Sequence, residues 1–186
     1  YNDVGLEIHL RAPSNARSLS FDSIFFSHEY PEWVCSPYND FFVVFMTPAP
    51  KGLDPNRRSR DDKNVVYDSR GDPVGVNTAL LASCRESDIP ARDIPCELGP
   101  ALLAGTGFDR EEATCGLTQE NHEVGGASTG WLRTVVPVEP GSNVTLHFML
   151  WDSGDPWLDS TVAIDNLHFE AVPQEKPSTG PITSAL

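Results

Sequence analysis

The stretch that decides the fold is VTLHFML, residues 144–150, in which apolar side chains occupy every second position. Side chains of a β-strand alternate between the two faces of a sheet, so this pattern predicts a strand with one buried and one wet face. LEIHL, residues 6–10, shows the same alternation near the other end of the chain. The sequence therefore predicts strands with a period of two at both ends.

Four further segments are rich in β-branched and aromatic residues and are bounded by Pro, Gly, Asn or Asp, which predicts more strands. They are residues 18–26, 41–46, 131–138 and 160–169. With 16 Pro and 14 Gly, the chain has little room for long helices. We expect an all-β fold, an antiparallel β-sandwich of jelly-roll type over residues 1–172, with long loops at 47–64 and 83–123. Residues 173–186 lack periodicity, which predicts an extended C-terminal tail.

Composition limits the partners that this domain can have. The 186 residues suit one domain, and 13 Lys and Arg against 27 Asp and Glu give a net charge of -14. A negative surface repels nucleic-acid phosphates and anionic lipids, so nucleic acid is not an expected partner. No apolar run reaches the roughly 18 residues that a membrane span needs, so membrane insertion is not expected either. Cations are favoured partners.

The four cysteines predict loops that are stapled by disulfides. They are Cys35, Cys84, Cys96 and Cys115, and none forms a C-x-x-C pair of the kind that indicates zinc. Of the three possible connectivities, we favour Cys84 with Cys96, because a short staple gives definition to the Pro-rich segment between them. That choice leaves Cys35 to pair with Cys115. The alternative is four reduced thiols; disulfides would place the chain in an oxidising, extracellular compartment.

The most acidic stretch is WDSGDPWLDSTVAID, residues 151–165. It places Asp152, Asp155 and Asp159 around a glycine in a tight turn that precedes a predicted strand. Ca²⁺ prefers about six to eight oxygen ligands, and such a turn supplies carboxylate and carbonyl oxygens. The spacing is not that of an EF-hand loop. Since Asp and Gly are also ordinary turn residues, a solvated turn is the alternative interpretation.

A second acidic segment lies in the connection between two predicted strands. It contains HEYPEW and YND, and it places Glu29, Asn39 and Asp40 beside bulky aromatic residues. Aromatic residues in a loop indicate that the loop is packed, and packed carboxylates need partners. Few basic residues lie nearby in the sequence to provide them.

The chain resembles the choice-of-anchor L domain, a family of exported bacterial surface proteins with differing C-terminal anchoring signals. The most specific parts of the resemblance are the EYPE…YND and WDSGD…DS blocks. GTGF at 105–108 and GASTGWLRT at 126–134 extend it over nearly the whole chain. The resemblance implies an extracellular β-sandwich and no established enzymatic reaction.

TVAIDNLHFE, residues 161–170, resembles the last strand of jelly-roll modules such as certain carbohydrate-binding modules and MAM domains. In those modules an Asp at the position of Asp165 often helps to bind a structural calcium, which implies this role for Asp165 and a bulge in its strand. The alternative is an edge-strand Asp that is bonded to a loop amide. Together, the acidic segments and the resemblances predict a Ca²⁺-binding protein. The expected ligands are Glu29, Asn39, Asp40, Asp152, Asp155, Asp159 and Asp165.

These features favour a non-catalytic, secreted module at the bacterial cell surface that acts in adhesion, surface display or matrix assembly. Its expected partners are cell-surface or matrix components, and the tail could link copies into a homo-oligomer by adding a strand to a neighbour's sheet. The alternative is a carbohydrate-binding protein or a glycan hydrolase. For a glycan, Trp157 is the best exposed platform, whereas Trp33, Trp131 and Trp151 adjoin apolar strand residues and are expected to pack.

Overall fold

The computed structural model describes residues 3–31, 33–54, 63–85, 96–109, 126–154 and 158–182. In these ranges the chain forms ten β-strands and no helix. Within the same ranges there is accordingly no helix of the length and hydrophobicity that crossing a bilayer requires.

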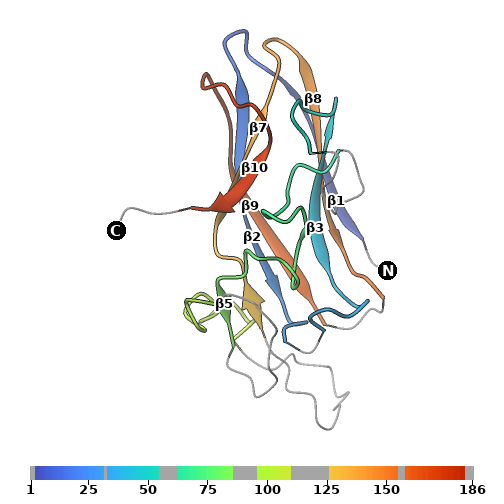
Figure 1. Cartoon of the computed structure of the whole chain (residues 1–186), viewed down its shortest axis with the longest axis vertical. Coiled ribbons are helices and arrows are strands. Elements are labelled where there is room, and N and C mark those ends of the chain that lie inside the picture. Colours follow the sequence, from blue (N-terminus) through green and yellow to red (C-terminus); the bar gives the residue numbers. More distant parts are fainter. Residues whose placement is uncertain are drawn as a thin grey trace.

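The strands form two sheets that face each other (Figure 1). The first sheet contains, in spatial order, β1 (Val4–Arg11), β8 (Asn143–Trp151), β3 (Phe41–Thr47) and β4 (Val74–Gly75). The second contains β10 (Ser178–Pro181), β7 (Leu132–Pro137), β2 (Ser18–Ser27), β6 (Ala127–Ser128) and β5 (Ser83–Cys84), with β9 (Ser160–Glu170) also paired to β2. Every pairing is antiparallel. The predicted antiparallel β-sandwich is therefore confirmed.

The connectivity follows the jelly-roll type. β1 pairs with β8, and β2, which follows β1, pairs with β7, which precedes β8. The chain thus forms nested pairs of strands that are shared between two sheets. All six strands that the alternation and composition predicted are present as β1, β2, β3, β7, β8 and β9.

The core lies between the two sheets, and it is built by the alternation seen in the sequence. In β8, Val144, Leu146 and Phe148 are buried, while the residues between them are partly exposed. Phe148 meets Phe21 of β2 from the opposite sheet in an edge-to-face contact, with ring centroids 5.1 Å apart. Burial of these apolar faces is the main force that holds the sheets together.

The segment after residue 172 differs from the expected tail. Ser178–Pro181 forms β10, which pairs with β7, and the hydroxyls of Thr134 and Thr179 are 3.0 Å apart across this pair. Pro177 is buried immediately before the strand. This part of the segment is a strand that completes the chain's own sheet. Strand exchange between copies would require β10 to leave β7.

Candidate metal site

Four strand ends meet at one end of the sandwich and position most of the predicted ligands. Ser27, the last residue of β2, pairs with Ser160, the first residue of β9. Phe41, the first residue of β3, pairs with Trp151, the last residue of β8. The two acidic connections therefore leave the sheets at the same end. A hydrogen bond of 3.1 Å from the amide of Ser153 to Oδ1 of Asp40 joins them directly.

Glu29 and Asp40 form the centre of this acidic cluster. Their exposed fractions are only 3% and 2%. The amide of Asp40 donates a hydrogen bond of 2.5 Å to Oε2 of Glu29, and the amide of Glu29 donates one of 3.0 Å to Oγ of Ser27. Strand ends and backbone amides thus fix two buried carboxylates side by side.

The pKa of the Asp40 carboxyl group is raised by its surroundings. Burial, which is the largest cause, and the negative charge of Asp152 together raise the pKa of Asp40 to about 6, although hydrogen bonds with Ser160, Ser153 and Glu29 act in the opposite direction. Burial and a like charge both disfavour the ionised form of a carboxyl group. A bound cation would have the opposite effect, because it favours the ionised form.

Asn39, which precedes Asp40 in the chain, carries a neutral side-chain oxygen. Its Nδ2 donates a hydrogen bond to the carbonyl of Ser36, while its Oδ1 is buried and accepts no hydrogen bond from the described residues. A buried acceptor without a donor is costly, and in proteins an ion or an ordered water often fills such a position. The amide oxygen is also a ligand type that Ca²⁺ accepts.

Several of the predicted ligands lie at this end of the sandwich. Glu29, Asp40 and Asp152 come together, Asn39 precedes Asp40 in the chain, and the carbonyl of Asp159 accepts a hydrogen bond of 3.1 Å from the amide of His28, which precedes Glu29. Within the described ranges, however, no three His, Cys, Asp or Glu side chains are arranged as a metal-binding group. Asp155 lies outside the described residues, so its part in the site stays a prediction.

Asp165 lies in a different place. It pairs with Asp22 of β2, five residues along β9 from Ser160, which corresponds to about 16 Å along a strand. The register shifts beside this pair, and Asn166 has a φ of 55°, so the predicted bulge is present. Oδ1 of Asp165 accepts a hydrogen bond of 2.7 Å from the amide of Asn166. Asp165 therefore does not join the cluster of Glu29 and Asp40.

Arg133 and Asp22 form a charged pair on the second sheet that the sequence analysis missed. Nε and Nη2 of Arg133 donate to the two carboxylate oxygens of Asp22 at 2.7 and 2.8 Å, and Nδ2 of Asn166 donates to Oδ2 at 2.9 Å. The bond to Arg133 lowers the pKa of Asp22 below its ordinary value, against the effect of burial. An Asp at a non-core position of the predicted strand 18–26 was the available signal.

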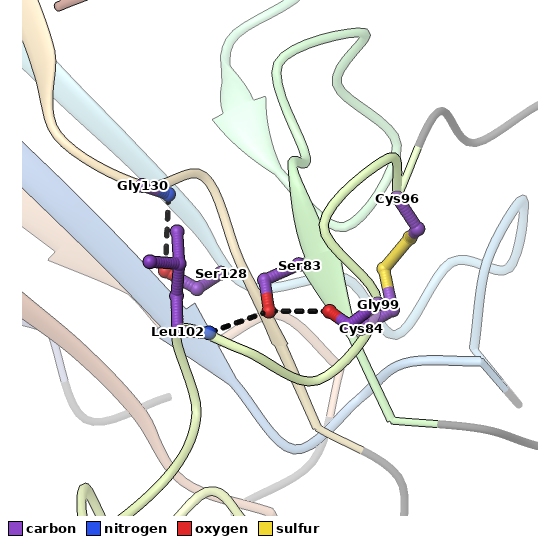
Figure 2. Close-up of a disulfide and its surroundings, with 7 residues drawn as sticks. All are labelled: Ser83, Cys84, Cys96, Gly99, Leu102, Ser128 and Gly130. Carbon is purple, nitrogen blue, oxygen red and sulfur yellow. Dashed lines mark hydrogen bonds between the residues drawn. A yellow bond between two sulfur atoms is a disulfide. The ribbon is translucent and has the colours of Figure 1, made fainter. Parts of the chain in front are cut away.

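Cys84 and Cys96 form the predicted disulfide, with 5.5 Å between their Cα atoms (Figure 2). This bond joins β5 to the turn that begins at Cys96 and so confirms a stapled loop. Cys35 is exposed and forms no disulfide with a described residue. Cys115 lies outside the described residues, so its pairing with Cys35 stays a prediction.

Two of the three tryptophans that were expected to pack do so, and the third is exposed. Trp33 packs edge-to-face on Tyr38, and Trp151 packs on Phe41, with ring centroids 5.2 and 5.5 Å apart. Trp131 was also expected to pack, but its exposed fraction is 42%, so that prediction is wrong. It lies immediately before Leu132, the first residue of β7, and so outside the strand whose alternate residues are buried. Trp157 lies outside the described residues.

The described residues define an antiparallel β-sandwich with a disulfide-bonded loop and an acidic end. The family model of the choice-of-anchor L domain matches residues 6–170 of the 186-residue chain. The chain belongs to the choice-of-anchor L domain family, which makes it a bacterial surface-associated or exported protein. No curated protein and no solved structure gives a significant match.

Proposed function

We propose that the chain is a non-catalytic, extracellular interaction module whose acidic end is held together by Ca²⁺. The surface-associated family supports the location, and the cluster of Glu29, Asp40 and Asp152 supports the metal. The observation that carries the proposal is the direct contact between the two acidic connections, in which buried Asp40 accepts the amide of Ser153 and lies beside buried Glu29.

Calcium would act on folding rather than on a reaction. Like charges that are close together in a buried site repel each other, and a divalent cation turns this repulsion into attraction. Because the site is assembled from two connections that the fold brings together, binding would favour the folded state. The module would then be rigid in the calcium-rich extracellular medium and present its surfaces for adhesion, display or matrix assembly.

Thermal melting tests this proposal. Metal-free protein is compared in excess Ca²⁺ and in excess chelator, for the wild type, for Asp152→Asn and for the control Asp165→Asn. At a hundredfold excess of Ca²⁺ over Kd, the folded state gains about 2.7 kcal/mol, which raises Tm by about 5 to 10 °C in a chain of this size. We expect this shift in the wild type and the control, and a clearly smaller one in Asp152→Asn. Equal melting curves with and without Ca²⁺ would overturn the metal proposal.

A further inference from the structure

A pocket of about 470 Å³ opens on the second sheet, away from the acidic cluster. Asp22 lines it from β2, on the face of the sheet opposite the buried Leu19 and Phe21, and Asp165 lines it from β9. Its size falls in the range of about 300 to 1,000 Å³ that is typical of ligand sites in proteins. Neither the family nor the calcium proposal assigns it a role.

The other large side chains that line this pocket are apolar or aromatic. This apolar wall includes Trp131, Leu98 and Leu102, whose exposed fractions are 42%, 51% and 36%. Ile182, which follows β10, also lines the pocket, and its amide donates a hydrogen bond of 2.9 Å to the carbonyl of Trp131. Large apolar side chains that are exposed together in one concave place mark an interaction site more often than single exposed ones do.

The disulfide-stapled turn holds this apolar wall in place (Figure 2). The amide of Leu98 donates to the carbonyl of Ala82 at 2.9 Å, and the amide of Leu102 donates to Oγ of Ser83 at 3.1 Å. The side chain of Leu102 fits against Gly130, where an added Cβ would lie 3.1 Å from Cδ1 of Leu102. A wall that is fixed before binding lowers the entropic cost of binding a ligand.

Of the two carboxylates that line the pocket, only one is paired with a positive charge among the described residues. Asp22 is neutralised by the two-pronged bond from Arg133, at 2.7 and 2.8 Å. Asp165 is exposed, its Oδ1 accepts only the amide of Asn166, and it forms no ion pair with a described residue. One carboxylate charge therefore faces the pocket without a counter-ion among the described residues. The exposed indole ring of Trp131 lines the same pocket, and the face of such a ring also attracts cations.

From this arrangement we infer that the pocket binds a lysine or arginine side chain of a partner polypeptide. The aliphatic stem would lie on Leu98 and Leu102, and the cationic head would reach Asp165 and the face of Trp131. The net charge of -14 favours a basic partner in the same way. This inference rests on the proposed role as an interaction module and does not depend on calcium.

A glycan fits the pocket less well, because a sugar needs both donors and acceptors from the protein. The lining carboxylates of Asp22 and Asp165 offer acceptors only. The hydroxyl of Thr129 already donates to the carbonyl of Gly130 and accepts the amide of Phe25, at 2.8 and 3.1 Å. Apart from the indole N–H of Trp131, the side chains that line the pocket offer no uncommitted donor, whereas a cationic side chain needs only acceptors and apolar surface.

NMR titration of the ¹⁵N-labelled full chain tests the inference with three probes. They are the blocked peptide Gly-Gly-Lys-Gly-Gly, the same peptide with norleucine in place of lysine, and N-acetylglucosamine. We expect the lysine peptide to shift the indole N–H of Trp131 and the amide of Gly130 with a Kd on the order of 1 mM. The norleucine peptide and the sugar should leave both signals unshifted. Added salt should weaken the binding of the lysine peptide.

Asp165→Asn keeps the acceptor for Asn166 and removes the charge, so it should fold and bind the lysine peptide about tenfold more weakly or worse. Asp3→Asn, the same change at an exposed position beside β1, should bind like the wild type. Equal affinity of Asp165→Asn and the wild type would overturn the inference, as would the absence of binding by the lysine peptide or binding by the sugar alone. Because all titrations are run both with Ca²⁺ and with chelator, failure of this pocket is distinguishable from failure of the calcium site.

Discussion

The backbone amide of Asp40 donates a hydrogen bond of 2.5 Å to Oε2 of Glu29, so two nearly fully buried carboxylates lie next to each other at one end of the sandwich. In water two such groups would ionise independently, but in a buried site the second charge is costly. The fold therefore concentrates negative charge where the connections of both sheets meet. Either protonation of one carboxylate or binding of a cation would relieve this repulsion. The two alternatives lead to different predictions.

The first prediction concerns pH in the absence of metal. The pKa of Asp40 is raised to about 6, from an ordinary value of 3.8. Between pH 4 and 6, approximately, the folded state keeps a proton that the unfolded state has released, so the free energy of unfolding falls as pH rises through this window. Urea denaturation in chelator should show this decline for the wild type relative to Asp40→Asn, which cannot titrate. A difference between the two proteins that does not change from pH 4 to pH 7 would argue against it.

The second prediction separates the metal from the charge. Asp40→Asn removes a buried charge but retains an oxygen for the amide of Ser153. At pH 7.5 in chelator, this variant should melt at or above the temperature of the wild type, because the repulsion from Asp152 is gone. In Ca²⁺ its Tm should change less than that of the wild type, because a charged ligand has been lost. Differential scanning calorimetry checks both signs, and a variant that keeps the full calcium shift contradicts the assignment of Asp40.

Asp68 leads to a third prediction, about the loop before β4. Its carboxylate accepts the amides of Arg70, Asp72 and Ala79 at 2.8, 3.0 and 2.8 Å, and its side chain is fully buried. Burial alone would raise the pKa of Asp68, but these amides and the charge of Arg70 outweigh burial and lower it. The stabilisation that the carboxylate provides is thus present above pH 4, approximately, and is lost as pH falls below the folded-state pKa.

Asp68→Ala should lower the free energy of unfolding by about 2 to 4 kcal/mol, because it leaves several buried donors without an acceptor. Asp68→Asn, which keeps one acceptor oxygen, should cost less. Urea denaturation at neutral pH measures both variants. A loss below about 1 kcal/mol for the alanine variant would show that water replaces the carboxylate in this loop.

The fourth prediction concerns the staple between Cys84 and Cys96, which are separated by 12 residues. In the chain-entropy description, closing a loop of this length in the unfolded state contributes about 3 kcal/mol to stability. Replacing both cysteines by serine should therefore lower the free energy of unfolding by an amount of this order. Peptide mapping without reduction would verify the bond in the wild type. Stability that is unchanged in the double variant would mean that the turn is held by its hydrogen bonds alone.

Much of the fold could be predicted because most strands of the sandwich show their own pattern of alternating or β-prone residues in the sequence. The alternation in residues 144–150 and 6–10 places one face of each strand in the core, and these segments became β8 and β1, which pair with each other. β10 was not predicted, since STGP has neither alternation nor large apolar residues. Its pairing with β7 depends on a partner edge that only the folded sheet provides.

The candidate site was predicted in part for a similar reason. Glu29 and Asp40 were recognisable because carboxylates lie among aromatic residues in one connection, and the structure buries both. The separation of Asp165 from them depends on strand length and register, which a single motif does not encode. The exposure of Trp131 likewise depends on where β7 begins, so neighbouring apolar residues were a poor guide to its burial.

Isothermal titration calorimetry of metal-free protein with Ca²⁺ at pH 7.5 tests the central claim most directly. We expect saturable binding of about one Ca²⁺ per chain, strongly weakened in Asp152→Asn and unchanged in Asp165→Asn, with much weaker binding of Mg²⁺, which requires a smaller octahedral shell. At pH 6 the binding enthalpy should also depend on the buffer, because Ca²⁺ displaces the proton that Asp40 holds there. No saturable heat at millimolar Ca²⁺, or equal binding in Asp152→Asn and the wild type, would contradict the account and leave the cluster as a proton-binding site.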